Sequence, residues 1–247
     1  MTTNSICRLC LTKKPLIRAH IIPRTFYRAV KGESKHALLL KPDASKYTEA
    51  TQSGITDSTI LCAECDRGLG VLDDYGYKIF GVPPTDAQLV VDRDRNPVAY
   101  SIQCDDVQKA QRFLLSMLWR ACITSHDFFR HVKLGDRHEE TIRLLLLHGG
   151  LVHEEDYEFI AIRFFDNPYD RGIMPPWKGR YPDVVAYNFY VPYYNFLIRT
   201  DRRQFQDDFS EARFLARTNC LCLRMPFRET PEAKYIGSVA LSLRNRT

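Results

Sequence analysis

The sequence predicts an α+β protein in which a small N-terminal zinc-binding module precedes a larger mixed domain. Three observations predict this class. Two Cys-x-x-Cys pairs lie within the first 65 residues, apolar residues recur at helical spacing between residues 105 and 148, and segments rich in β-branched and aromatic residues follow from residue 157. The composition, 45% apolar and 26% charged, is that of an ordinary globular protein and argues against a disordered chain.

Helical signals come first along the chain. Pro23 suits the first turn of a short helix that runs to about Lys31 and stops at Gly32. A longer helix is predicted from about residue 105 to residue 123, and its N-terminal end carries two aspartates. In a third helix Asp136 can cap together with Glu139, and Gly149 ends the helix.

Strand signals surround and follow these helices. Gln88 to Val91 and Val98 to Ile102 flank a polar turn and predict a hairpin. Further strands are predicted at residues 159–165, 184–191, 193–199 and 219–225. We expect the helices to pack on an antiparallel sheet. The Pro-rich segment 81–84 predicts a boundary between a module at 1–83 and an α+β domain at 84–247.

The expected compartment is the cytoplasm. The chain begins without a charged segment followed by an apolar one, so no secretory signal is predicted, and no apolar run reaches the roughly 20 residues that cross a bilayer. Thiols stay reduced in the cytoplasm, where paired cysteines more often indicate a metal site than a disulfide.

The two Cys-x-x-Cys pairs, Cys7/Cys10 and Cys62/Cys65, predict a structural zinc site. Four thiolates satisfy tetrahedral Zn²⁺, and a two-residue gap lets both sulfurs of a pair face one ion. The alternatives are two disulfides, redox-active dithiols, or buried small apolar side chains. The remaining cysteines, at positions 104, 122, 220 and 222, are expected to be structural.

A family resemblance rests on the order of three short motifs. These are Cys7-x-x-Cys10, then Ala19-His20-Ile21-Ile22-Pro23, then Leu61-Cys62-x-x-Cys65. Together they resemble the zinc-stapled branch of the HNH endonucleases, over roughly residues 7–80. The resemblance implies a ββα-metal active site built on a treble-clef zinc framework.

The resemblance also implies catalytic roles. His20 matches the first histidine of the HNH motif, the general base that activates water for attack on a phosphodiester. Asp66 and Asp73 follow the second cysteine pair, and their carboxylates suit Mg²⁺ or Mn²⁺. Ala19 stands where the family commonly has an acidic ligand or a histidine. The alternative interpretation of both aspartates is a solvated helix face.

Four basic residues surround the predicted base and are candidates for gripping nucleic-acid phosphates: Arg18, Arg24, Arg28 and Lys31. The last three share one face of the short helix, although an ordinary exposed face has the same pattern. The formal net charge of +5 is compatible with nucleic acid but does not argue for it. The aromatic segment 187–196 is interpreted as core rather than as a base-stacking surface.

Three functional hypotheses follow. The first is a metal-dependent HNH-like endonuclease acting on nucleic acid, with DNA as the favoured substrate and, by resemblance, a restriction or defence context. The second is a catalytically inactive treble clef that binds nucleic acid or a protein partner. The third is a purely structural zinc module that serves an unidentified α+β enzyme.

Overall fold

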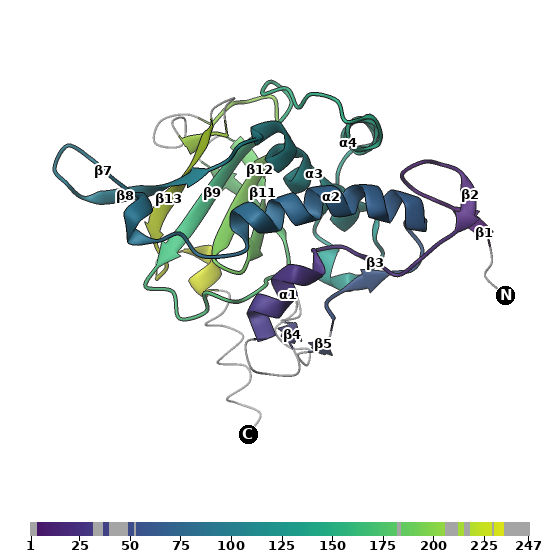
Figure 1. Ribbon diagram of the computed structural model, residues 1–247, viewed down its shortest axis with the longest axis horizontal. Coiled ribbons are helices and arrows are strands. Elements are labelled where there is room, and N and C mark those ends of the chain that lie inside the picture. The colour runs from purple at the N-terminus through teal and green to yellow at the C-terminus, as the bar shows by residue number, and fades with distance from the viewer. Residues whose placement is uncertain are drawn as a thin grey trace.

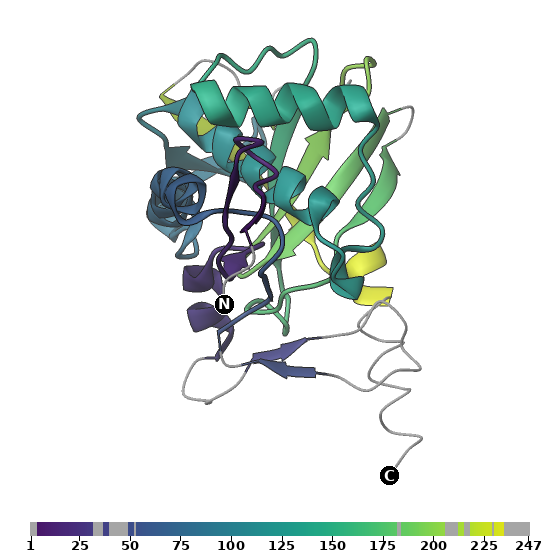
Figure 2. The ribbon, with the colours of Figure 1, turned by 90° about the vertical axis from the view of Figure 1, so that its right-hand side faces the viewer.

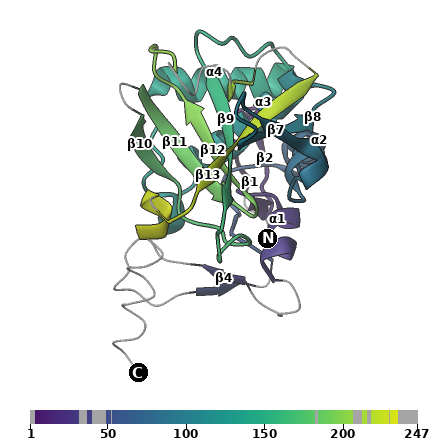
Figure 3. The ribbon, with the colours of Figure 1, turned by 90° about the vertical axis from the view of Figure 1, so that its left-hand side faces the viewer.

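A computed structural model describes residues 4–31, 37–39, 49–51, 53–181, 184–205, 212–214, 218–228 and 230–234. The fold is mixed α+β, with one large sheet packed against helices (Figure 1). The sheet has seven strands in the order β10-β11-β12-β9-β13-β8-β7, and antiparallel pairs dominate it. Figure 3 shows the strands in front and α2, α3 and α4 on the far side. The α+β class is confirmed.

The first third of the chain forms small paired strands around two helices. Its elements are β1 (Asn4–Ile6), β2 (Lys13–Pro15), β3 (Ala19–His20), α1 (Arg24–Lys31), β4 (Ala37–Leu39), β5 (Glu49–Thr51), β6 (Thr56–Asp57) and α2 (Ala63–Phe80). The strands pair antiparallel as β1 with β2, β3 with β6, and β4 with β5. The predicted short helix is therefore present and begins one residue after Pro23, while its predicted stop, Gly32, lies outside the described residues.

The described residues after α2 form the large sheet, the helices α3 and α4, and a helical turn at residues 231–234. The strands and the two helices are β7 (Leu89–Val91), β8 (Pro97–Gln103), α3 (Val107–Ile123), α4 (Asp136–His148), β9 (Glu158–Phe165), β10 (Trp177–Tyr181), β11 (Val184–Val191), β12 (Tyr194–Arg199) and β13 (Asn219–Pro226). Short 3₁₀ turns lie at Asp86–Gln88 and Asp127–Phe129. In Figure 2, α4 crosses above the β1–β2 hairpin.

Most of the predicted elements are confirmed, with one correction at a helix start. Asp106 caps α3 by accepting a hydrogen bond from the Lys109 amide at 2.8 Å. Gly149 ends α4 in the left-handed conformation. The predicted cap at Asp136 is wrong, because Gly135 is the capping residue and Asp136 is the first residue of the helix.

The sheet differs from the prediction in two places. β13 pairs parallel with β9, from Cys222 opposite Ala161 to Pro226 opposite Phe165, so the sheet is not wholly antiparallel. Strand β10 was not predicted. It is a half-exposed edge strand containing Lys178 and Gly179, and such strands carry little apolar pattern.

One apolar cluster spans the predicted boundary. Phe80, at the end of α2, contacts the rings of Phe113, Tyr194 and Phe196 with centroid separations of 4.8–6.5 Å. The same cluster includes Cys7, Ile21 and other buried residues from the first 83 positions. Residues before and after position 83 thus share a core, and the division into 1–83 and 84–247 stays a prediction. None of the described helices combines the length and apolar character that crossing a bilayer requires.

Two glycines of α2 provide a matched test of how this helix packs. A Cβ at Gly76 would lie 2.4 Å from the Phe113 ring, whereas a Cβ at Gly70 would meet nothing within 4 Å. We expect Gly76→Ala to lower the free energy of unfolding by about 1–3 kcal/mol through overpacking. Gly70→Ala should raise it by about 0.5–1 kcal/mol, because glycine is unfavourable within a helix. Urea denaturation measures both, and equal effects would contradict the α2–α3 packing.

Candidate metal centre and the adjoining polar site

The four cysteines of the two Cys-x-x-Cys pairs come together in space. Cys7 and Cys10 lie in the loop after β1, Cys62 is the N-cap of α2, and Cys65 lies in the first turn of that helix. Their sulfur atoms all lie within 4.8 Å of one another. All eight cysteines of the chain are free thiols. Within the described residues this is the one group of three or more side chains spaced to hold a metal ion.

Backbone hydrogen bonds shape the loop that carries Cys7 and Cys10. The Leu11 amide donates to the Cys7 carbonyl at 2.9 Å, and Leu11 itself adopts the left-handed conformation with φ 57°. The Arg8 amide donates to the Ile60 carbonyl at 2.8 Å, and this bond ties the loop to the segment before α2. The Cys62 amide donates to Cys7 Sγ at 3.4 Å. Such a donor stabilises a thiolate, as a metal site requires.

The donor set fits a tetrahedral ion. Thiolates bound at about 2.3 Å place their sulfurs roughly 3.8 Å apart, which is compatible with the observed cluster. Burial and the neighbouring thiols raise the pKa of Cys65. Burial also opposes ionisation of Cys10, but hydrogen bonds with Thr12 outweigh it and lower its pKa to about 6. A bound cation would outweigh the effect of burial and favour the thiolate form of all four cysteines.

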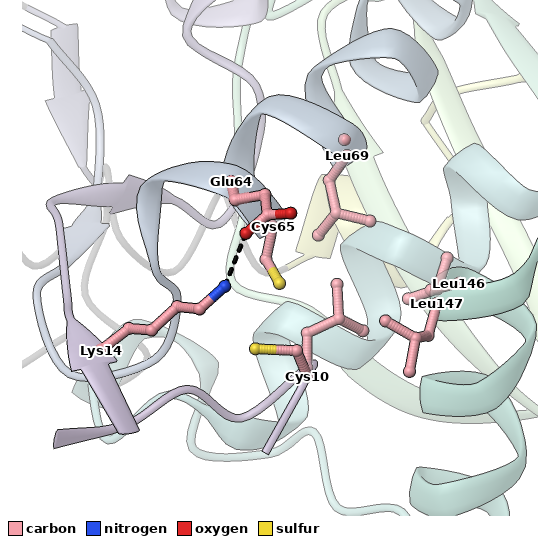
Figure 4. Close-up of a pocket in the computed structure, with 9 residues that line it drawn as sticks. Cys10, Lys14, Glu64, Cys65, Leu69, Leu146 and Leu147 are labelled. Atoms are coloured by element: carbon pink, nitrogen blue, oxygen red, sulfur yellow. Dashed lines mark hydrogen bonds and ion pairs between the residues drawn. The ribbon is translucent and has the colours of Figure 1, made fainter. Parts of the chain in front are cut away.

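A small pocket adjoins the cysteine cluster (Figure 4). Its volume is about 250 Å³, and Cys10 and Cys65 line it together with Leu69, Leu146 and Leu147. At its edge, Lys14 forms an ion pair with Glu64 at 2.6 Å. The two leucines of α4 place that helix beside the loop, and Arg143 of α4 donates to the Leu9 carbonyl at 2.6 Å. Helix α4 therefore packs against the loop that carries Cys7 and Cys10 and helps to hold it in place.

His20 lies half-buried at the end of β3, and its tautomer follows from its partner. Its Nε2 lies 3.0 Å from the Ser53 carbonyl oxygen, which can only accept, so Nε2 carries the proton. Burial lowers the pKa of His20, and the nearby Arg120 and Arg24 lower it further. The imidazole is thus neutral at pH 7, with its lone pair on Nδ1.

Asp66 shares this site with His20. It follows Cys65 in the first turn of α2, and its carboxylate makes no hydrogen bond or ion pair with the described part of the chain. Burial raises its pKa, while Arg120 and His20 oppose that rise. Each side chain therefore lies close enough to alter the pKa of the other. A half-buried carboxylate that has no partner in the described part of the chain, close to a neutral imidazole, can bind a cation or accept a proton.

Asp73 lies on the same helix but has a partner. It forms a two-pronged ion pair with Arg120 of α3, at 2.6 and 2.9 Å, and only 1% of the Arg120 side chain is exposed. Arg120 also donates to the His20 carbonyl at 2.9 Å. In the sequence Arg120 belongs to the polar side of an amphipathic helix, so its burial was not predicted. The sequence does carry one indication of this burial, because the residues directly before and after Arg120 are apolar.

Three of the four predicted phosphate-binding residues line a second small pocket. Arg24, Arg28 and Lys31 of α1 line it with Tyr27 and Ser53, and its volume is about 90 Å³. Ser53 is also the residue whose carbonyl accepts from His20, so this basic pocket adjoins the predicted base. Arg18 is not among the residues that line this pocket, and its guanidinium donates to the Thr56 hydroxyl at 3.3 Å.

Comparison with protein-family models, with curated proteins and with solved structures gave no significant match. Inference about function therefore depends on the geometry of the two adjoining sites. The roles predicted for His20, Asp66, Asp73 and the basic residues stay predictions.

Removal of one cysteine of the cluster tests the metal centre. Cys62→Ser should lose the bound metal ion and destabilise residues 7–80, because metal binding contributes folding free energy directly. Cys104→Ser, a buried thiol outside the cluster, should keep the metal. Elemental analysis of the purified proteins gives the metal content per chain. Equal metal content in the two variants would exclude the cluster as a metal site.

Neutralising Asp73 tests whether its ion pair is structural. Asp73→Asn leaves the buried Arg120 charge without its carboxylate, and we expect a loss of about 3 kcal/mol in the free energy of unfolding. The adjacent, exposed Asp74 is the matched control, and Asp74→Asn should change stability by less than about 0.5 kcal/mol. Thermal and urea unfolding give both values. If Asp73→Asn leaves stability unchanged, the ion pair is not structural, and the Asp73 carboxylate of the wild type is available as a cation ligand.

Proposed function

We propose that this protein is a metal-dependent endonuclease of the HNH type, with structural Zn²⁺ on the four cysteines and nucleic acid, favoured as DNA, as its substrate. The observation that carries the proposal is the proximity of a neutral His20 to Asp66, whose carboxylate has no hydrogen-bond or ion-pair partner among the described residues. The order of β3, β6 and α2 along residues 19–80 supports it, because His20 lies on the first strand and Asp66 on the helix.

In this proposal His20 is the general base. Hydrogen bonding of Nε2 to the Ser53 carbonyl fixes the ring and directs the Nδ1 lone pair away from that carbonyl. Nδ1 accepts a proton from a water molecule as its oxygen attacks the phosphorus, and the bond to the leaving oxygen breaks. Arg24 and Arg28 hold neighbouring phosphates of the same strand.

Asp66 would supply the carboxylate that holds a catalytic Mg²⁺ or Mn²⁺. When bound, such a cation would neutralise the charge that develops on the phosphoryl and leaving oxygens. Arg120 has a positioning role, since it holds the His20 backbone and keeps Asp73 next to Asp66.

The second candidate is a catalytically silent treble clef that binds nucleic acid or a protein. One observation favours it: the ion pair with Arg120 occupies Asp73, so the predicted site keeps a single free carboxylate. Binding without cleavage across Mg²⁺, Mn²⁺, Ni²⁺ and Ca²⁺ is the result expected from that candidate.

Plasmid nicking by the zinc-loaded protein tests the enzyme proposal. With Mg²⁺ or Mn²⁺ the wild type should nick, and His20→Ala should reduce the rate at least a hundredfold, in line with loss of a general base. Asp66→Asn should raise the cation concentration needed for half-maximal rate. His153→Ala, which removes an exposed histidine, is the matched control and should cleave normally. Wild-type activity in His20→Ala would remove that residue from the mechanism.

The pH profile of the same reaction provides an independent readout. Because burial lowers the pKa of His20 below its ordinary value of 6.5, most of the base stays unprotonated at pH 7, and the nicking rate at pH 7 should exceed half of its value at pH 8. The rate should fall only as pH drops through the depressed pKa. A rate that is already halved at pH 7 would indicate a base with a higher pKa.

A further inference from the structure

A separate pocket lies between α1 and the loop that follows β9. Val30 lines it from α1, and residues 168–172 line it from the loop. Its volume of about 370 Å³ is in the range of about 300–1,000 Å³ typical of ligand pockets. None of the predicted site residues lines this pocket. The two pockets share helix α1, however. Val30 lines this pocket, while Arg28 and Lys31, two residues before it and one residue after it in the sequence, line the basic pocket next to His20.

Hydrogen bonds hold the loop in a defined shape. The Tyr169 amide donates to Asn167 Oδ1 at 2.9 Å, and the Gly172 amide donates to the Tyr169 carbonyl at 2.8 Å. The Tyr190 hydroxyl donates to the same carbonyl at 3.1 Å. The backbone of Tyr169 is therefore fixed from both sides, so little ordering is needed when a ligand binds.

The charge balance of the loop favours an anion. Asp170 is the one acidic residue lining the pocket, and both of its oxygens bind the Arg163 guanidinium. The Tyr193 amide donates to the backbone carbonyl of Asp170 at 2.7 Å. Arg171, by contrast, is exposed at the pocket wall. The one carboxylate that the described residues place in the pocket lining is therefore paired with Arg163 and not with Arg171.

Tyr169 offers an aromatic surface beside these charges. Its side chain is 46% exposed, and its ring packs at a tilt against Phe227 with centroids 6.2 Å apart. An isolated exposed tyrosine is common on protein surfaces. Here Tyr169 lines a pocket, on a loop held by hydrogen bonds, and the exposed Arg171 lines the same pocket. An aromatic ring with neighbouring cations is the arrangement that binds single-stranded nucleic acid, in which bases stack and phosphates pair with arginine.

We propose that this pocket binds one nucleotide of a single strand, with the base stacked on Tyr169 and a phosphate on Arg171. The strand would continue along α1 into the basic pocket beside His20. This proposal rests on the proposed nucleic-acid function and adds a preference to it. Bases in a duplex are already stacked on one another, so the site selects single-stranded over double-stranded substrate.

Fluorescence anisotropy with the full-length, zinc-loaded protein tests the proposal. The probes are a labelled 12-nucleotide single strand and the matching duplex, without added Mg²⁺ or Mn²⁺. The wild type should bind the single strand more tightly. Tyr169→Ala should weaken that binding about tenfold and leave duplex binding unchanged, whereas Tyr169→Phe should bind as the wild type does. Leu151→Ala, which shortens a 65% exposed side chain elsewhere, is the control for nonspecific surface effects.

A further variant separates this proposal from the one on which it rests. Arg28→Ala should weaken binding of both probes, because it removes a phosphate contact beside His20. If Arg28→Ala weakens binding and Tyr169→Ala does not, the stacking site is excluded while nucleic-acid binding stands. If the wild type binds neither probe, both proposals fail. Circular dichroism shows that each variant keeps its fold.

Discussion

The guanidinium of Arg120 lies where its side chain is 1% exposed, and a charge in such a place is stable only when it is paired. Two of its hydrogen-bond partners come from other elements: the Asp73 carboxylate of α2 and the His20 carbonyl of β3. Its Nε also donates to the Ser116 carbonyl of its own helix at 3.2 Å. One side chain of α3 therefore fixes the helix and the strand that carry the candidate catalytic residues. The same charge lowers the pKa of His20 and opposes the burial-induced rise in the pKa of Asp66.

The cysteine cluster provides the second constraint on the same region. It joins the loop after β1 to the first turn of α2, and so it orients the turn in which Asp66 follows Cys65. Phe80, at the opposite end of α2, is fixed by ring contacts with α3 and β12. The helix is thus held at its start by the cluster, in its middle by Arg120 and at its end by aromatic packing. The position of Asp66 relative to His20 depends on all three.

What could be predicted from the sequence follows local rules. The spacing of Cys7, Cys10, Cys62 and Cys65 predicted the cluster, because a two-residue gap directs both sulfurs of a pair to one point. Periodicity predicted α3 and α4, and β-branched and aromatic residues predicted six of the seven strands of the large sheet. The parallel pairing of β13 with β9 could not be predicted from the sequence, since the residues of a strand do not specify which neighbouring strand it pairs with. The burial of Arg120 and its pairing with Asp73 were also missed, because a charged side chain on an amphipathic helix resembles an exposed one until its tertiary partner is known.

The small ligand set at the proposed catalytic site has a physical consequence of its own. Mg²⁺ retains several waters and commonly binds through one or two carboxylates together with substrate phosphates. With Asp73 held by Arg120, the described residues offer Asp66 as the free carboxylate that lies close enough to His20 to alter its pKa. Phosphate oxygens would then have to complete the coordination sphere. Under the proposed function, cation and nucleic acid therefore bind cooperatively, and by linkage each tightens the binding of the other by the same factor.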